Sequence, residues 1–226
     1  MTIQDRSLHA PAVPFQDRKD AGRRLAQKLA SCGLQNPLVL ALPRGGVPVG
    51  VEIARTLRAP LDLLLARKIG TSWQPELAIG AVIGGSHPRT VINRDIASIA
   101  GVTEADLTRI AKIQFEELER RRHLWLGRHH SLSPAGHTAI LVDDGVATGA
   151  TMRVALEAVR AENPLRLVLA SPVAPEQTAQ MLRGLCDEAV FLETPRTFSA
   201  VGAFYRDFHQ LRDGEVRALL NSARKI

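Results

Sequence analysis

Residues 140–151, ILVDDGVATGAT, constrain the fold more than any other part of the chain. They join a run of apolar, mostly β-branched residues to two adjacent acids and a turn that contains glycine and threonine. A helical pattern opens at about Ala150. Backbone N–H groups in such a turn form an anion pocket with the positive end of the helix dipole, and Gly145 and Gly149 permit positive φ there. The string therefore predicts a strand, a phosphate-binding turn and the start of a helix.

Asp143 and Asp144 are expected to contact a different part of the ligand, because a carboxylate beside a phosphate repels it. Hydroxyl groups suit them as partners, for example those of a ribose whose 5′-phosphate lies in the turn. We expect Asp144 to lie at an exposed strand end, where Asp144→Asn leaves the fold intact. Two alternatives stay open for these residues: a turn that merely caps a helix, and a magnesium-dependent phosphatase with Asp143 as its nucleophile.

The length of 226 residues suits a single domain with a buried core. No apolar stretch approaches the roughly 20 residues that span a bilayer, so we expect no membrane partner. The first residues lack the pattern of a secretory signal, which favours a cytoplasmic protein. Cys32 and Cys186 show no metal-like spacing, and the sequence predicts no metal bound directly by side chains.

Apolar runs alternate with amphipathic segments, which predicts an α/β fold with an open, mainly parallel sheet flanked by helices. The core is expected at about 36–192, with packing segments and a small hood at about 1–30 and 193–226. The runs 79–83 and 90–93 predict a hairpin. Strands are expected at 38–42, 61–66, 138–142, 165–170 and 189–192, and helices at 20–29, 47–57, from 103, from about 149 and at 176–185.

Two further loops carry chemistry at predicted strand ends. Residues 42–46, LPRGG, place Arg44 and two glycines after the first strand, which suits close approach of the backbone to an anion beside a guanidinium. After the second strand come Arg67 and Lys68, and the composition of residues 70–76 predicts a mobile lid. For both loops the alternative is an ordinary turn with solvated charges.

The whole string of residues 140–151 resembles the phosphoribosyl diphosphate (PRPP) binding motif of type I phosphoribosyltransferases. From about 15 to 219 the chain is similar to a bacterial group of this family, with ALPRGGVPVG, ARKIG and PELAIGAV in the expected order. The resemblance implies PRPP as donor, Mg²⁺ bound mainly through PRPP, and a strained or cis non-proline peptide in the 42–46 loop. It implies catalytic roles for Asp143, Asp144, Arg44 and Lys68. The PRPP-binding residues it implies are Gly45, Gly46, Arg67, Gly145, Val146, Ala147, Thr148, Gly149, Ala150 and Thr151.

The implied reaction moves ribose 5-phosphate from PRPP to a nitrogen nucleophile, such as a heterocyclic base, and releases pyrophosphate, as in nucleotide metabolism. Ala147 stands where hypoxanthine-guanine enzymes carry an aspartate, so a general base of that kind is missing. An unidentified small-molecule acceptor is expected under the hood. Phe198, Phe204 and Tyr205 could stack on it, or could pin a terminal helix to the sheet.

The net charge of +6 leaves a second class of function open, a non-catalytic PRPP-sensing regulator that binds nucleic acid. The densest basic cluster, residues 120–123, lies at the end of a predicted helix, where positive charge complements the helix dipole. No aromatic residues for base stacking are interleaved with it, so we do not expect nucleic acid as a partner. The sequence leaves open whether the protein is a homo-oligomer.

Overall fold

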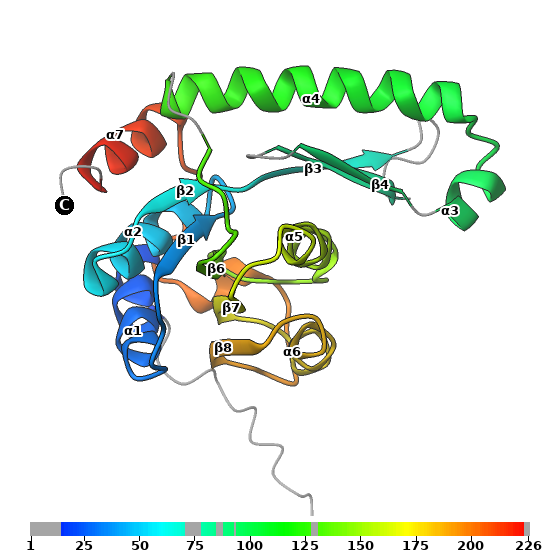
Figure 1. Ribbon diagram of the computed structural model, residues 1–226. Helices are drawn as coiled ribbons and strands as arrows, with labels where there is room; N and C mark the ends of the chain where they lie inside the picture. The colour runs from blue at the N-terminus through cyan, green and yellow to red at the C-terminus, as the bar shows by residue number, and fades with distance from the viewer. Residues whose placement is uncertain (1–14, 71–77, 85–87, 93, 128–130, 224–226) are drawn as a thin grey trace, which may run out of the picture.

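The computed structural model describes residues 15–70, 78–84, 88–92, 94–127 and 131–223. Five parallel strands form an open sheet in the order β2-β1-β6-β7-β8, with helices on both faces (Figure 1). This confirms the predicted α/β fold. The strands are β1 (Pro37–Ala41), β2 (Leu61–Leu63), β6 (Thr138–Val142), β7 (Arg166–Val173) and β8 (Glu188–Glu193).

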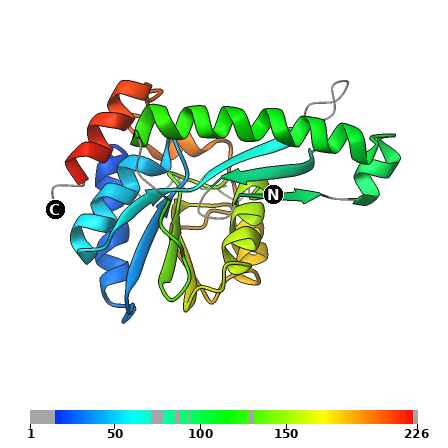
Figure 2. The same ribbon diagram turned by 45° about the horizontal axis from the view of Figure 1, so that its top comes forward.

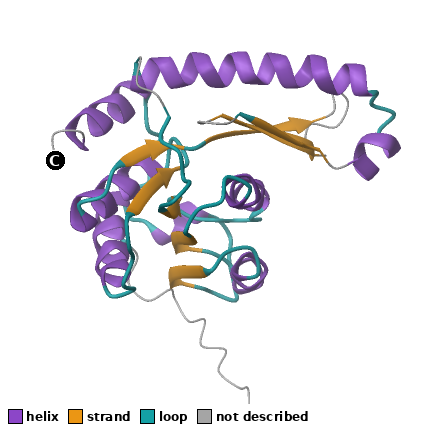
Figure 3. Cartoon of the chain, viewed as in Figure 1, coloured by secondary structure: helices purple, strands orange, loops and turns teal. Residues whose placement is uncertain are grey.

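Helices α1 (Arg18–Ala30) and α2 (Gly46–Leu57) cover one face of this sheet, and α5 (Ala150–Arg160) and α6 (Glu176–Arg183) cover the other (Figure 3). Alternate residues of β6 point to opposite faces. Ile140 packs in the cluster with α1 and α2, whereas Leu141 packs in the cluster with α5. Burial on both faces explains why the strand reads as a continuous apolar run.

A second sheet is antiparallel, in the order β3-β4-β5, and confirms the predicted hairpin between β4 and β5. Helix α4 (Glu104–Leu126) lies along this sheet (Figure 2), and Val82, Leu118 and Trp125 belong to the apolar cluster between them. Thr103 and Asp106 cap the helix reciprocally, and the helix begins where the sequence predicts it. The other elements of this part are β3 (Leu65–Gly70), β4 (Ala78–Gly84), β5 (Arg89–Ile92) and α3 (Arg94–Ile99).

The prediction of one strand over residues 61–66 is wrong, because the chain changes sheets at Leu64. β2 pairs in parallel with β1, whereas β3 pairs with β4 in the second sheet. The side chain of Leu64 joins the core of the parallel sheet and that of Leu65 joins the cluster under α4. Two cores thus divide one apolar run, and no glycine or proline marks the boundary in the sequence.

Both ends of the described chain pack onto the core. Phe15 forms a parallel bridge with Tyr205, and its N–H donates to the carbonyl of Phe204, the last residue of the short helix η1 (Val201–Phe204). Helix α7 (Asp213–Ala223) contacts α2 and α4. Among the described helices, none combines the length and apolar character that crossing a membrane requires.

Candidate functional site

The site lies where the strand order of the parallel sheet reverses. β1 and β6 are neighbours in register, with Ala41 opposite Val142, and β1 leads outward to β2 while β6 leads to β7 on the other side. The loops 42–46 and 143–149 therefore leave adjacent strands at their carboxyl ends. Open α/β sheets bind ligands in the crevice at such a switch point.

Glycines allow these two loops to touch. A Cβ on Gly45 would overlap the carboxylate of Asp144, and a Cβ on Gly46 would lie 2.5 Å from the carbonyl oxygen of Val142. The Pro43–Arg44 peptide bond is cis, as the resemblance implies for this loop. The backbone of the first loop thus lies directly against the acids of the second.

The second loop ends in an exposed turn at the start of α5. Gly149 caps the helix with φ +78, which glycine adopts readily. Ala147 and Thr148 are exposed, and the carbonyl of Ala147 accepts a hydrogen bond of 2.9 Å from the Thr178 hydroxyl. The N–H groups of a first helical turn have no partner within the helix, and the dipole adds positive potential. This turn can therefore bind a phosphate, and Thr151 adds an exposed side chain there.

A cavity of about 260 Å³ lies where the two loops meet β3 and α4, with Asp143 and Thr151 on its wall. Two cationic side chains, Arg67 from β3 and Arg121 from α4, also line it. They share Glu117, whose carboxylate lies 3.7 Å from Arg67 and 2.7 Å from Arg121. Hydrogen bonds from Arg120 and Arg121 lower the pKa of Glu117 to about 2. The cavity thus combines an acid with groups that attract anions.

A larger hollow of about 700 Å³ adjoins this cavity between α5 and the second sheet. It shares Ala66, Arg67 and Thr151 with the smaller cavity, and Thr148 and Ala150 of the phosphate turn also line it. The turn therefore faces open space on the side of β3–β5 as well.

The two acids have different surroundings. Asp143 keeps part of its surface open to the cavity, and its carboxylate accepts the N–H of Asp144 at 2.9 Å. Burial raises the pKa of Asp143, and the negative charge of Asp144 raises it further. Burial also raises the pKa of Asp144, while the Arg18 guanidinium acts in the opposite direction.

The prediction that Asp144 lies at an exposed strand end is wrong. Its residue is 9% exposed, its carboxylate pairs with Arg18 at 2.6 Å, and its carbonyl accepts a hydrogen bond from the Tyr205 hydroxyl. The two chain ends supply these partners and cover the acid. A charge removed here leaves a buried guanidinium without its counter-ion, so Asp144→Asn cannot be expected to leave the fold unaffected.

The predicted cationic residues are placed unequally. Arg67 reaches the cavity, whereas Arg44 turns to the C-terminal segment, where it donates to the carbonyl of Leu211 at 2.6 Å and lies 3.7 Å from Asp213. Lys68 lies on β3, with its main chain opposite Ala81. The predicted lid falls largely on residues 71–77, which lie outside the described residues.

The predicted acceptor aromatics form a packed cluster with the start of the chain. The ring centroids of Phe15 and Tyr205 lie 5.3 Å apart, and those of Phe198 and Phe204 lie 5.7 Å apart. Phe204 and Tyr205 are buried. This arrangement agrees with the alternative in which the aromatics fasten the chain ends to the sheet.

The sequence places Arg18 with the expected hood, but it points neither to Arg18 as the partner of Asp144 nor to Arg121 as a residue of the cavity. Arg121 belongs to the basic cluster at a helix end, and only the docking of α4 over β3 brings it to the cavity. No local signal connects Arg18 with Asp144, which lies 126 positions away.

Comparison with known proteins gives one consistent answer. The family model of the phosphoribosyl transferase domain matches residues 15–208. Two Mycobacterium tuberculosis proteins, named "Putative phosphoribosyl transferase Rv0571c" and "Putative phosphoribosyl transferase MT0597", are each 43% identical over 211 residues, which is 93% of this chain. The chain spans about half the length of these curated relatives, 47%. The crystal structure of TT1426 from Thermus thermophilus superposes with a TM-score of 0.81 at 40% identity, and covers 93% of this chain and 99% of that one.

Proposed function

The chain belongs to the phosphoribosyltransferase family, and we propose that it transfers ribose 5-phosphate from PRPP to a nitrogen nucleophile, a heterocyclic base, with release of pyrophosphate. The observation that carries the proposal is the cavity where the loops after β1 and β6 meet β3 and α4. Asp143, Thr151 and two arginines, Arg67 and Arg121, all line it. A sugar with an anion at each end needs such a combination of an acid with anion-binding groups.

The 5′-phosphate of the donor would bind in the turn of residues 147–151, whose amides and hydroxyls suit it. Asp143, which faces the cavity, would accept hydrogen bonds from the ribose hydroxyls. The carboxylate of Asp144 is engaged by Arg18 and does not line the cavity, so we propose that it supports Asp143 and does not itself bind the sugar. Fixing the sugar at both ends reduces the entropy lost in reaching the transition state.

The diphosphate would lie toward Arg67 and Arg121, beside the backbone of Gly45 and Gly46. The resemblance also implies Arg44 and Lys68 as partners of the diphosphate, and Arg44 would have to leave the carbonyl of Leu211 to reach it. Negative charge that grows on the leaving pyrophosphate is stabilised most by cations already in place. Ala147 supplies no proton acceptor, so the acceptor base must lose its proton to another group or to water.

Magnesium fits this proposal as an ion carried by the substrate. Within the part of the chain that the structure describes, no three His, Cys, Asp or Glu side chains gather to hold a metal. Asp143 alone at the cavity suits an ion whose remaining ligands are substrate oxygens and water, as Mg²⁺ prefers. When bound, Mg²⁺ would neutralise charge on the diphosphate.

The test is a pyrophosphate-release assay with PRPP, Mg²⁺ and a panel of purine, pyrimidine and other nitrogen heterocycles. We expect release that depends on one class of acceptor. If PRPP binds, no acceptor leads to pyrophosphate release, and nucleic acid binds with an affinity that falls steeply with salt, the protein is the regulator instead. Release of inorganic phosphate through an aspartyl-phosphate intermediate would identify the phosphatase.

A further inference from the structure

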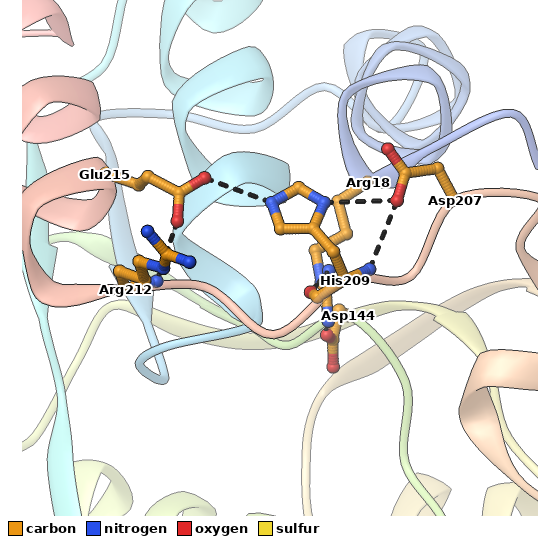
Figure 4. Close-up of polar contacts among 6 residues, drawn as sticks. All are labelled: Arg18, Asp144, Asp207, His209, Arg212 and Glu215. Atoms are coloured by element: carbon orange, nitrogen blue, oxygen red, sulfur yellow. Dashed lines mark hydrogen bonds and ion pairs between the residues drawn. The ribbon is translucent and has the colours of Figure 1, made fainter.

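Arg18 reaches the acids of the site from a part of the chain that no motif connects with them. It is the first residue of α1, and its Nε lies 2.6 Å from Oδ2 of Asp144. Their side chains are only 9% and 12% exposed. Figure 4 shows Arg18 meeting Asp144 beneath the C-terminal segment that carries His209. The pair therefore joins the N-terminal helix to the ligand-facing end of β6.

The Arg18 guanidinium also contacts the C-terminal segment. Nη1 of Arg18 donates to the carbonyl oxygen of His209 at 3.0 Å, and its Cζ lies 3.8 Å from the centroid of the Phe208 ring. A cation over an aromatic face is attracted to it. Neither Arg18 nor Asp144 lines the cavity that holds Asp143, so an effect of Arg18 on that cavity would have to pass through the contact between the two acids.

Arg18 lies among groups that would otherwise leave two acids next to each other without a cation. The titratable groups that face it are Asp143 on the same turn, Arg18 from α1 and Tyr205 from the C-terminal segment, while the loop after β1 faces it with the uncharged Gly45. Two adjacent buried carboxylates disfavour each other's ionisation. Arg18 is the one cation among these groups, so it offsets the repulsion between the acids.

We propose that Arg18 is a positioning residue for the sugar site: it holds the carboxylate of Asp144 in place, which leaves Asp143 as the acid that accepts the ribose hydroxyls. The proposal rests on the proposed function, because it concerns the same ligand. In this proposal the two acids of the motif have different roles. Asp143 binds the sugar, and Asp144 is held by Arg18 of α1.

A matched control is present elsewhere in the chain. Arg122 and Asp62 also form a buried pair, with 3.6 Å between Nη1 and Oδ1 and side chains 7% exposed, but neither lines the cavity of Asp143. Removing either arginine leaves a buried acid without its cationic partner, which destabilises a fold. Only Arg18 should also change sugar binding.

The experiment measures PRPP affinity of the full chain by calorimetry, with Mg²⁺, between pH 5 and 9, for wild type, Arg18→Met, Arg18→Lys and Arg122→Met. Without Arg18 the pKa of Asp144 rises, since Arg18 lowers it. We expect Arg18→Met to bind roughly tenfold more weakly at neutral pH, the effect of about one pKa unit, with the acid limb of its binding profile moved to higher pH. Arg18→Lys should restore that limb, and Arg122→Met should keep wild-type affinity.

The double variant Arg18→Met/Asp144→Asn removes both charges of the buried pair, so neither charge is left without its counter-ion. It therefore separates the effect of an uncompensated Asp144 charge on PRPP binding from a general loss of fold stability. It should regain most of the affinity lost in Arg18→Met. Unchanged affinity and pH profile in folded Arg18→Met would overturn the inference, as would an equal loss in Arg122→Met or no recovery in the double variant. If the wild-type protein does not bind PRPP, the proposed function itself fails, so the two failures are distinguishable.

Discussion

The carboxylate of Asp144 occupies the space beside Gly45 in which any other residue would place its Cβ. Gly45 belongs to the loop after β1 and Asp144 to the loop after β6, and the Arg18 guanidinium contacts the same carboxylate oxygen, Oδ2, that lies nearest to Gly45. The position of the acid is thus confined by a glycine and an arginine from two different parts of the chain. This confinement explains why the first loop needs glycine, and several consequences can be measured.

Replacing Gly45 by alanine should push the Asp144 carboxylate out of its position. Overpacking of this kind costs about 1–3 kcal/mol of unfolding free energy, and we expect weaker PRPP binding as well. Gly214→Ala is the matched control: a Cβ on Gly214 meets nothing within 4 Å, and the residue lies in helix α7. Denaturant unfolding and calorimetry on both variants check this. Equal stability and affinity in the two would contradict the close contact.

Asp144→Asn should lower the unfolding free energy by about 3 kcal/mol, because it leaves the buried Arg18 without its counter-ion. Glu176→Gln serves as a control, since Glu176 pairs with Arg196 at an exposed site and should change stability by less than about 0.5 kcal/mol. Urea titrations followed by circular dichroism give both values. A loss for Asp144→Asn no larger than that of the control would show that the pair does not stabilise the fold.

Arg121→Ala should lower kcat/KM for PRPP on the order of tenfold to a hundredfold, because it removes a cation from the part of the cavity in which we propose that the diphosphate binds. Arg120→Ala makes a sharp comparison. Arg120 bonds to the same Glu117 carboxylate, but it does not line the cavity, so its loss should leave kcat/KM within about twofold of wild type. Steady-state pyrophosphate release measures both. Similar losses in the two variants would assign the effect to Glu117 and not to the cavity.

We expect the contribution of His209 to the stability of the fold to depend on pH. Its ring lies between Asp207 at 3.1 Å and Glu215 at 3.0 Å (Figure 4), and hydrogen bonds to Asp207 and then Glu215 raise its pKa. A raised pKa means that the stabilisation is fully present below the unfolded-state value of about 6.5 and is lost as pH rises through the folded-state value. The Tm of wild type should therefore exceed that of His209→Gln at pH 6, and the difference should shrink by pH 9. A difference that grows with pH would contradict this assignment.

The sequence predicts most of the parallel core because its signals are local. The apolar runs, the turn with Gly149 and the capping box of Thr103 and Asp106 each depend on a few neighbouring residues. The break at Leu64 could not be predicted in this way. Which of two sheets a residue joins depends on the packing of α4, far along the chain, and the local pattern is apolar on both sides of the break.

The candidate site also contains features that local sequence predicts and features that depend on distant parts of the chain. Its phosphate turn and its acids follow from the string of residues 140–151, since backbone turns and strand ends are set locally. The partner of Asp144 could not be predicted from this string. Arg18 meets Asp144 only when α1 packs against the sheet and the C-terminal segment packs over the pair. The place of Arg44 in a loop predicts a contact with the diphosphate, yet its contacts with Leu211 and Asp213 come from that same distant segment.

The central claim is that the loops after β1 and β6 bind an activated pentose phosphate between an acid and a helix start. Calorimetric titration of the folded wild-type protein with PRPP and Mg²⁺ tests it most directly, with ribose 5-phosphate as a second ligand that lacks the diphosphate. We predict saturable binding of PRPP at one site and weaker binding of ribose 5-phosphate. Absence of measurable binding of PRPP to the folded protein would contradict the claim.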